Sequence, residues 1–508
     1  MKTAQKLQLE NDKLRAEIQK QNGLLKLNNS RIKDQKKELL NKINYINKLE
    51  ATLFDLRKHR FGSSSEKDKN QLPLFNEAES LTEVKSKVIP KGKKKTGVRK
   101  PLPEVLERVE KTYDLDESQK LCPNDGSQLK PIGEVINEQL KFIPASIKVI
   151  KHTCYKYACP KCNKHIITAT KPKDPLPKSI ATPELLSYVS ISKYADGLPL
   201  YRLSQMFNRL DIKISRSNLA NWMIKCGILI QSLINLMQDK IYQQPCINID
   251  ETTLQVLKEP GKKASAKSYM WVMRAADVIL FNYDPSRSSK VADKLLADYD
   301  QAIMCDGYGG YDSAVAKNKI IRLGCWAHAR RYFIKVTDQG ENHNAQNMIN
   351  LIGQLYCVEK QSKEKDYKPD KIKKNRSKQS VPILKKIRQL LDETLHSTTP
   401  SGLMGKALGY LNNQWPNLIE YTKDGNYPID NNVAENAIRP FVIGRKNWLF
   451  ANSVRGAKAS ANLYSLIETA KAHKLNPQNY LINIYKQLPN TNTVEDIEKL
   501  LPWNFKPD

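Results

Sequence analysis

Hydrophobic residues recur every seven positions along the first 57 residues of the chain. The repeat consists of Ile18, Leu25, Ile32, Leu39, Ile46 and Leu53. Glu and Lys are frequent between them and no proline interrupts, so residues 1–57 are predicted to form one long helix that self-associates as a coiled coil. A second seam is broken by polar residues such as Gln21 and Asn28, which leaves a lone helix packed on the rest of the protein as the alternative.

Residues 58–118 lose this periodicity. The stretches RKHRFGSSSEKDKN and IPKGKKKTGVRKPLP are rich in Lys, Ser and Gly and offer too little apolar surface to fold. We therefore expect a basic flexible linker that contacts DNA phosphates. The alternative is an inert solvated tether.

Residues 119–170 combine short alternating segments with a cluster of cysteines. CPKC supplies Cys159 and Cys162 at the spacing of a zinc knuckle, whereas CPND supplies Cys122 and Asp125, with the aspartate where a second cysteine is expected. We predict a zinc-ribbon-like, DNA-binding module in which these four side chains hold Zn²⁺. Other side chains that would complete the tetrahedron are Cys154, His152 and His165.

Residues 171–240 show helical periodicity. LYRLSQMFNRL, the short DIKI and SRSNLANWMIKCGILI predict a helix-turn-helix-like region in which Ser215 caps the second helix. Arg216 and Asn218, at the start of that helix, would then contact DNA. The alternative is an ordinary helical pair without such a role.

From residue 241 onward, strand patterns interleave with helical ones, which predicts a mixed α/β core. Residues 241–337 contain several strands, among them a hairpin in SYMWVMRAADVILFNY. Residues 338–428 are predicted to be helical, with KEKDYKPDKIKKNRSKQS as an exposed loop. Residues 429–475 hold an amphipathic helix that runs into a basic loop, and residues 476–508 form a closing helical segment.

The net charge of the chain indicates which class of molecule it binds. Lys and Arg number 83 against 53 Asp and Glu, a net charge of +30. Nucleic acid is the usual partner of such an excess, although ribosomal, membrane-surface and chaperone proteins share it. No apolar run approaches the ~20 residues of a spanning helix, and the N-terminus lacks a secretory signal. We expect a cytoplasmic, nucleoid-associated protein that contacts no membrane, with nine cysteines outside disulfides.

Three acidic residues stand in unusual places. Asp250 follows the apolar run CINI and Asp306 follows AIMC, so both are predicted near strand ends, with glycines opening space beside Asp306. Glu435 falls on a predicted helix. Half-buried carboxylates need a counter-charge, and two Mg²⁺ (or Mn²⁺) ions would supply it while promoting phosphodiester chemistry. The alternative is that these acids are turn formers or caps.

Longer motifs run through most of the chain. They are LRKHRFGSSSEK, KYACPKC, KYADGLPLYRLSQMF, SRSNLANW, DETTLQVL, DGYGGYD, GCWAHARRYF and NNVAENAIRPFVIGRKNWLFANSVRGAKASANLYSLIETAKAHKLNP. In these motifs the chain resembles, over nearly its whole length, the transposases of the insertion sequence 66 family, the large transposase C protein of those elements. The tail motif is the most specific of them.

The resemblance implies a ribonuclease-H-like catalytic core whose DDE triad is Asp250, Asp306 and Glu435, with residues 338–428 as a helical insertion. It implies a DNA transposase that acts on the terminal inverted repeats of its element and on target DNA, together with accessory proteins of the same element. The expected fold class is multidomain, α+β and α/β. Asp125 departs from the family's cysteine, which puts zinc binding in doubt.

Basic residues near these acids are candidates for gripping DNA. They are His328, Arg330, Arg331, Arg439, Arg445, Lys446 and Arg455. The alternatives are a structural histidine and a solvated basic face, and Trp448 is expected in the core. Two other functions stay open: a non-catalytic zinc and coiled-coil DNA-binding regulator, and a metal-dependent nuclease on the same fold that cuts without joining.

Overall fold

A computed structural model describes residues 15, 17–36, 38–39, 42, 147–158 and 166–506. The chain divides into two compact units, residues 85–171 and the remainder. The predicted linker, residues 58–118, lies outside the described residues. The same holds for Cys122, Asp125, Cys159 and Cys162.

A mixed sheet forms the centre of the larger unit. In the described part of the chain its order is β5-β4-β3-β6-β7, with the short β8 also paired to β3. β3 to β5 run antiparallel, whereas β6, β7 and β8 are parallel to β3. The strands are β3 (Cys246–Lys258), β4 (Lys267–Ala275), β5 (Val278–Asp284), β6 (Ala302–Cys305), β7 (Ile321–Gly324) and β8 (Ala451–Ser453). The predicted hairpin is therefore present, as β4 and β5.

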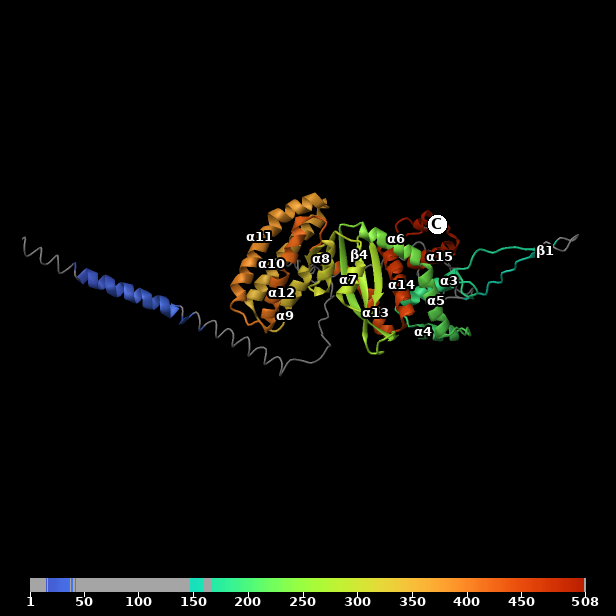
Figure 1. The fold of residues 1–508 in the computed structure, drawn as a ribbon, viewed down its shortest axis with the longest axis horizontal. Helices are drawn as coiled ribbons and strands as arrows, with labels where there is room; N and C mark the ends of the chain where they lie inside the picture. The colour runs from blue at the N-terminus through green and yellow to red at the C-terminus, as the bar shows by residue number, and fades with distance from the viewer. Residues whose placement is uncertain are drawn as a thin grey trace, which may run out of the picture. The chain divides into compact units, whose positions relative to one another are not determined.

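Helices cover this sheet and extend it (Figure 1). Short helices follow the strands: α7 (Ser289–Leu295), η2 (Gly309–Tyr311) and α8 (Asp312–Asn318). A larger helical group consists of α3 (Pro183–Tyr194), α4 (Leu200–Asn208), α5 (Arg216–Leu229), α6 (Gln231–Tyr242), α13 (Asn432–Trp448), α14 (Val454–Ala472), α15 (Pro477–Gln487), η4 (Leu488–Asn490) and α16 (Val494–Glu498). The side chain of Ser215 caps α5, accepting the backbone N–H of Asn218 at 3.1 Å, as the sequence predicts.

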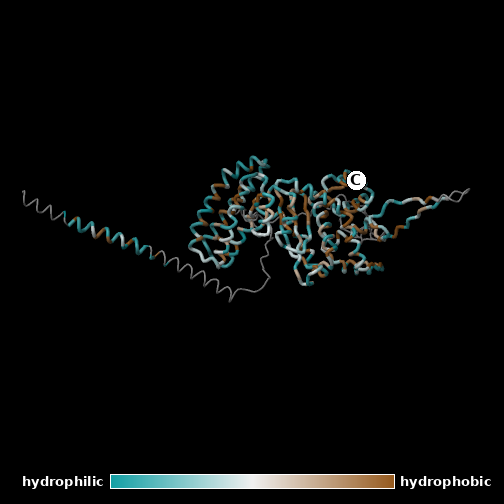
Figure 2. The backbone as a smooth tube through the Cα atoms, viewed as in Figure 1, coloured by the Kyte–Doolittle hydropathy of each residue, from teal (hydrophilic) through white to brown (hydrophobic). Residues whose placement is uncertain are grey.

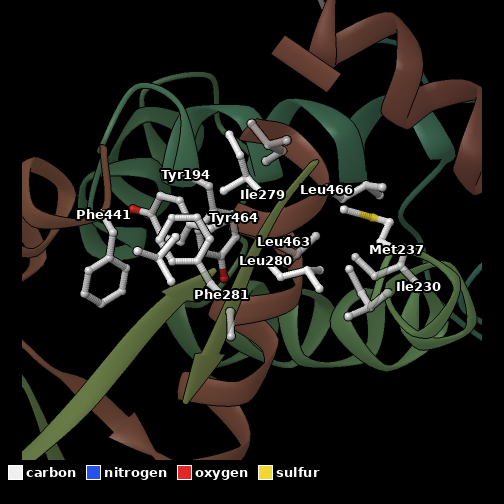
Figure 3. Close-up of a cluster of buried hydrophobic side chains, with 14 of the residues drawn as sticks. Tyr194, Ile230, Met237, Ile279, Leu280, Phe281, Phe441, Leu463, Tyr464 and Leu466 are labelled. Atoms are coloured by element: carbon white, nitrogen blue, oxygen red, sulfur yellow. The ribbon is translucent and has the colours of Figure 1, made fainter. Parts of the chain in front are cut away.

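Helix α14 closes one edge of the sheet. β5 is an edge strand, and its outward N–H groups would stay unpaired beside an apolar helix. Two buried hydroxyls of α14 accept them: Thr469 from the N–H of Ile279 at 3.0 Å, and Ser465 from that of Phe281 at 2.7 Å. Around them, side chains from the strand and four helices form the cluster in Figure 3. The hydroxyl groups of α14 therefore satisfy backbone N–H groups at this edge of the sheet.

A second helical layer has its own hydrophobic core and packs through α12 on β7, the edge opposite α14. Its elements are α9 (Trp326–Thr337), α10 (His343–Glu364), α11 (Pro369–Leu395), α12 (Leu403–Ile419) and η3 (Glu420–Lys423). Helix α9 already contributes Trp326 and Phe333 to this core. The indole of Trp326 donates to the carbonyl oxygen of Leu418 at 2.8 Å, which anchors the layer beside the sheet.

The prediction of an exposed loop for KEKDYKPDKIKKNRSKQS is wrong, because most of that segment is the start of α11. Its inward positions are polar, which hid the helical pattern. Arg376 is 3% exposed, donates to both carboxylate oxygens of Glu359 at 2.9 and 2.7 Å, and also donates to two backbone carbonyls. Arg376, buried and paired with Glu359, therefore occupies an inward position of α11 where the helical pattern expects an apolar residue.

The predicted basic loop after Glu435 is also wrong. Helix α13 continues through Arg445 and Lys446 to Trp448, and the chain then passes through β8 into α14, which carries Arg455. Trp448 is half-buried and packs edge-on against Phe441, with 5.6 Å between ring centroids. Packing against the sheet therefore keeps a helix where the basic sequence suggested a loop.

The described N-terminal residues are helical, as the heptad pattern predicts. Ile18, Leu25, Ile32 and Leu39 are each about half exposed, whereas Ile46 and Leu53 lie outside the described residues. Figure 2 shows this segment as mainly hydrophilic and the sheet as rich in hydrophobic stretches. Self-association through this stripe stays a prediction.

The smaller unit contains one described hairpin. β1 (Lys156–Ala158) pairs antiparallel with β2 (Ile166–Thr168), on either side of the CPKC segment in sequence. Cys154 and His152, two alternative zinc ligands, are exposed just before β1, and His165 lies outside the described residues.

Within the described residues, no single helix is long and apolar enough to cross a membrane. The pair α5 and α6, bent by 49° where they meet, passes that test together by length and composition only.

Candidate active site

Asp250 lies inside the central strand, not near its end as predicted. β3 pairs with β6 only from Cys246 to Asn248, then continues to Lys258 along β4. Asp250 is thus the second residue beyond the last parallel pair, where one side of the strand is no longer covered by β6. One of its carboxylate oxygens accepts the backbone N–H of Glu251 at 2.8 Å.

The surroundings of Asp250 are acidic. Burial, together with the charges of Glu251, Glu435 and Asp306, raises the pKa of its carboxyl to about 8. The three predicted acids therefore lie close enough in the fold to act on one another, although 129 residues separate Asp306 from Glu435 in sequence. A buried carboxylate among carboxylates is a strong attractor for a cation.

Asp306 follows β6 directly, as predicted. One carboxylate oxygen accepts the backbone N–H of Tyr308 at 3.0 Å, and the carbonyl oxygen of Asp306 accepts Nη2 of Arg322 at 2.9 Å. The expectation of open space beside it is wrong: a Cβ on Gly307 would lie 2.8 Å from the ring of Tyr410. Glycine here permits close packing of α12 against the loop.

Glu435 lies in the first turn of α13 and its side chain is 8% exposed. Nη2 of Arg331, on α9, donates to both of its oxygens, at 2.6 and 2.7 Å. Nδ1 of His328 lies 3.6 Å from Oε1. Burial, and then the charge of Arg331, lower the pKa of His328. The third acid is thus held by the helix that begins the second helical layer.

A pair of buried asparagines, which sequence reasoning missed, joins α13 to β3. Asn431, directly before α13, is 1% exposed; its Nδ2 donates to the carbonyl oxygen of Ile249 at 2.9 Å. Its Oδ1 accepts Nδ2 of Asn248 at 3.0 Å. An asparagine inside the apolar run CINI was the available signal, because a buried amide needs partners.

Glu251 is a fourth acid that the sequence analysis passed over. Nη2 and Nε of Arg287 contact its Oε1 at 2.5 and 2.6 Å, and the hydroxyl of Tyr311 donates to Oε2 at 2.6 Å. Burial raises the pKa of Glu251, whereas Tyr311 and Arg287 lower it. Protein donors therefore hold both oxygens of Glu251 in place, next to Asp250 in the strand.

The oxygen donors are of the kind that hard divalent cations prefer. Among the described residues, however, no three His, Cys, Asp or Glu side chains stand together as a ready-made metal site. Both oxygens of Glu435 contact the guanidinium of Arg331 instead.

The remaining DNA-binding candidates differ in exposure. Arg216 and Asn218 are exposed at the start of α5, and Arg439, Lys446 and Arg455 are exposed on α13 and α14. Arg330 is only 4% exposed, which makes it the least accessible of the set.

Arg445 is half-buried, and its Nη1 donates to the hydroxyls of Thr252 and Thr253, at 3.0 and 3.1 Å, and to the backbone carbonyl of Thr253. The side chain of Arg445 therefore links α13 to β3. A contact between Arg445 and DNA stays a prediction.

Comparison with known proteins gives consistent matches. Residues 178–459 match a family model described as "Transposase IS66 family", and residues 465–503 match "IS66 C-terminal element". Residues 119–163 match "zinc-finger binding domain of transposase IS66", and residues 48–110 match "Transposase C of IS166 homeodomain".

Two similar proteins come from Sinorhizobium fredii, and both are described as uncharacterized. Protein y4qI is 30% identical over 492 residues, which cover 91% of this chain and 90% of the relative. Protein y4jD is 27% identical over 414 residues, which cover 78% of this chain and 80% of the relative.

Proposed function

The chain belongs to the IS66 family of transposases, and from this premise we propose that it cuts and joins DNA with Asp250, Asp306 and Glu435 as its catalytic acids. The proposed substrates are the terminal inverted repeats of its element and a target DNA. The observation that carries the proposal is the burial of Asp250 on the central strand with other carboxylates as its charged neighbours.

The sheet supports a ribonuclease-H-like core. Three antiparallel strands, β3 to β5, are followed by the parallel β6 and β7 on the other side of β3. The three acids come from β3, from the loop after β6 and from the first turn of α13. The helical layer from α9 to η3 interrupts the sequence between the second and third acids, as expected of an insertion in such a core.

The donor chemistry fits Mg²⁺ or Mn²⁺, held by Asp250, Asp306 and Glu435. These residues would hold two such ions, whose chemistry would be activation of the attacking water or 3′-hydroxyl and stabilisation of the leaving oxygen. The protein's own groups hold this centre in place: Arg287 and Tyr311 fix Glu251 behind Asp250, and the asparagine pair fixes the start of α13. We assign to Arg331 and His328, which lie beside Glu435, the role of orienting a phosphate.

Other parts of the chain contribute binding. The basic surface contacts DNA phosphates, so DNA affinity falls steeply with salt. We further propose that Cys159 and Cys162, with Cys122 and Asp125, hold Zn²⁺ in the smaller unit, that the N-terminal helix makes homo-oligomers, and that accessory proteins of the element take part. The site of action is the nucleoid.

The test is cleavage of a labelled end of the element in Mg²⁺ and in EDTA. Asp250→Asn, Asp306→Asn and Glu435→Gln keep side-chain shape and should each lower nicking by about three orders of magnitude, several kcal/mol of barrier, without loss of DNA binding. Asp300→Asn, at an exposed acid two residues before β6, is the control and should cut normally. Unchanged cutting by the three variants would mean that other carboxylates carry the chemistry.

Joining of the cut end to a second DNA distinguishes the transposase from the nuclease that cuts only. DNA binding without cutting, in either metal and with the accessory proteins added, would favour the non-catalytic regulator.

A further inference from the structure

The turn after α13 is strained and exposes two large apolar side chains. Leu449 has φ 66° and ψ −50°, a conformation that bulky L residues rarely adopt. The N–H of Phe450 donates to the carbonyl oxygen of Trp448 at 2.9 Å, which closes a three-residue turn around Leu449. Leu449 is 64% exposed and Phe450 40% exposed. Such strain persists only where surrounding structure enforces it, and it often marks a functional site.

Rigid elements on both sides enforce this turn. Before it, the carbonyl oxygen of Arg445 accepts the N–H of Leu449 at 2.7 Å, while the Arg445 side chain is tied to β3. After it, β8 pairs with the distal part of β3, Ala451 beside Val256 and Ser453 beside Lys258. Hydrogen bonds on both sides of the turn therefore fix the backbone that carries the two exposed apolar side chains.

The charge around the turn indicates its partner. Residues 436–467 contain no acidic residue and five basic ones. Of these, Lys446, Arg455 and Lys458 are exposed beside the turn in sequence, and Lys258 is exposed on the paired strand. Exposed apolar side chains on a segment whose charged residues are all basic suit a polyanion with a stacked, apolar interior, which is DNA. Proteins that deform DNA insert Leu or Phe between base pairs in this manner.

We propose that Leu449 and Phe450 form a wedge that enters the DNA base stack and fixes the duplex relative to the carboxylate site. The proposal rests on the proposed function. Leu449 lies 14 residues beyond Glu435, just past the end of the same helix, about 21 Å along the helix axis. Along a straight duplex that runs parallel to α13, which is the arrangement we propose, that distance corresponds to about six base pairs. The wedge would thus set the register between a distorted step and the phosphate that is cut.

The experiment uses the full chain and duplex ends of its element, with 2-aminopurine placed in turn at each position within ten base pairs of the cut. Fluorescence of this probe rises when its stacking is lost, and anisotropy on the same samples reports binding. We expect a rise at one step, about six base pairs from the cut. Phe450→Ala and Leu449→Gly should abolish it and weaken binding about tenfold.

Two controls protect the result against misfolding. Leu449→Gly relieves the strained backbone, so its loss of signal cannot come from added strain, and circular dichroism melts check both variants. Val494→Ala removes an exposed apolar side chain on α16 and should behave like the wild type. Binding and cutting without any fluorescence rise would overturn the wedge alone, as would a rise that persists in both variants. Absence of DNA binding would overturn the wedge and the proposed function together.

Discussion

The sheet and the helices hold their acids in opposite ways. Asp250 and Asp306 accept backbone N–H groups of nearby residues, and the charged neighbours that act on Asp250 are carboxylates. Glu435 instead meets a guanidinium that neutralises it within the protein. The two acids at the ends of this comparison therefore differ in their charged surroundings: Asp250 lies among other acids, whereas Glu435 has an internal counter-charge in Arg331.

Among the substitutions, the largest expected effect on stability at a single pH comes from removing that internal cation. Arg331→Ala leaves the Glu435 carboxylate buried without its main partner and should lower the free energy of unfolding by about 3 kcal/mol. Urea denaturation in EDTA measures it. Arg331→Ala combined with Glu435→Gln should recover most of the loss, and Arg216→Ala, an exposed arginine, should cost little. An unchanged midpoint for Arg331→Ala would show that the ion pair adds nothing.

The sheet half should respond to pH. Burial raises the pKa of Asp250 from 3.8 to about 8, so the folded state holds a proton that the unfolded state releases between these values. Without metal, the contribution of Asp250 to the free energy of unfolding is therefore fully present below pH 4. It is lost as the pH rises towards 8, by up to about 1.4 kcal/mol per pH unit. Asp250→Asn should flatten that slope, and Mg²⁺ should offset it at pH 8. Parallel pH profiles of the variant and the wild type would contradict the assignment.

The link between the two halves should have an intermediate effect. Asn431→Ala removes the hydrogen bonds to Ile249 and Asn248 and leaves buried polar groups unpaired, at a cost of about 1.5 kcal/mol. Because it frees the start of α13 from β3, cutting should fall more than DNA binding does. Asn436→Ala, at an exposed residue five positions further along and within α13, is the control. Equal losses in both variants would indicate a general effect on the helix.

The smallest effect concerns the support behind Asp250. Tyr311→Phe keeps the ring packed against Trp271 but removes the hydroxyl that donates to Glu251, at about 1 kcal/mol. Calorimetric melting measures the change. Cutting should be reduced only modestly, because Arg287 still holds Glu251. A loss as deep as that of Asp250→Asn would place Glu251 among the catalytic acids.

Sequence patterns served well where burial is apolar and local. The β4–β5 hairpin, the cap at Ser215 and the place of Asp306 after a strand follow from alternation, capping chemistry and an apolar run. They failed where buried positions are polar. Arg376 on α11 and the asparagine pair at 248 and 431 have partners distant in sequence, so no local pattern reveals them.

The sequence by itself determined the family, the basic charge, most of the helices and strands, and which acids to consider. Only the tertiary structure decided that Asp250 lies within a strand, that Glu435 is paired with Arg331, and that Leu449 is held at positive φ. The physical reason is the distance along the chain over which each interaction acts. Propensity, capping and periodicity act over a few residues, whereas burial and charge pairing depend on elements that meet only when the chain folds.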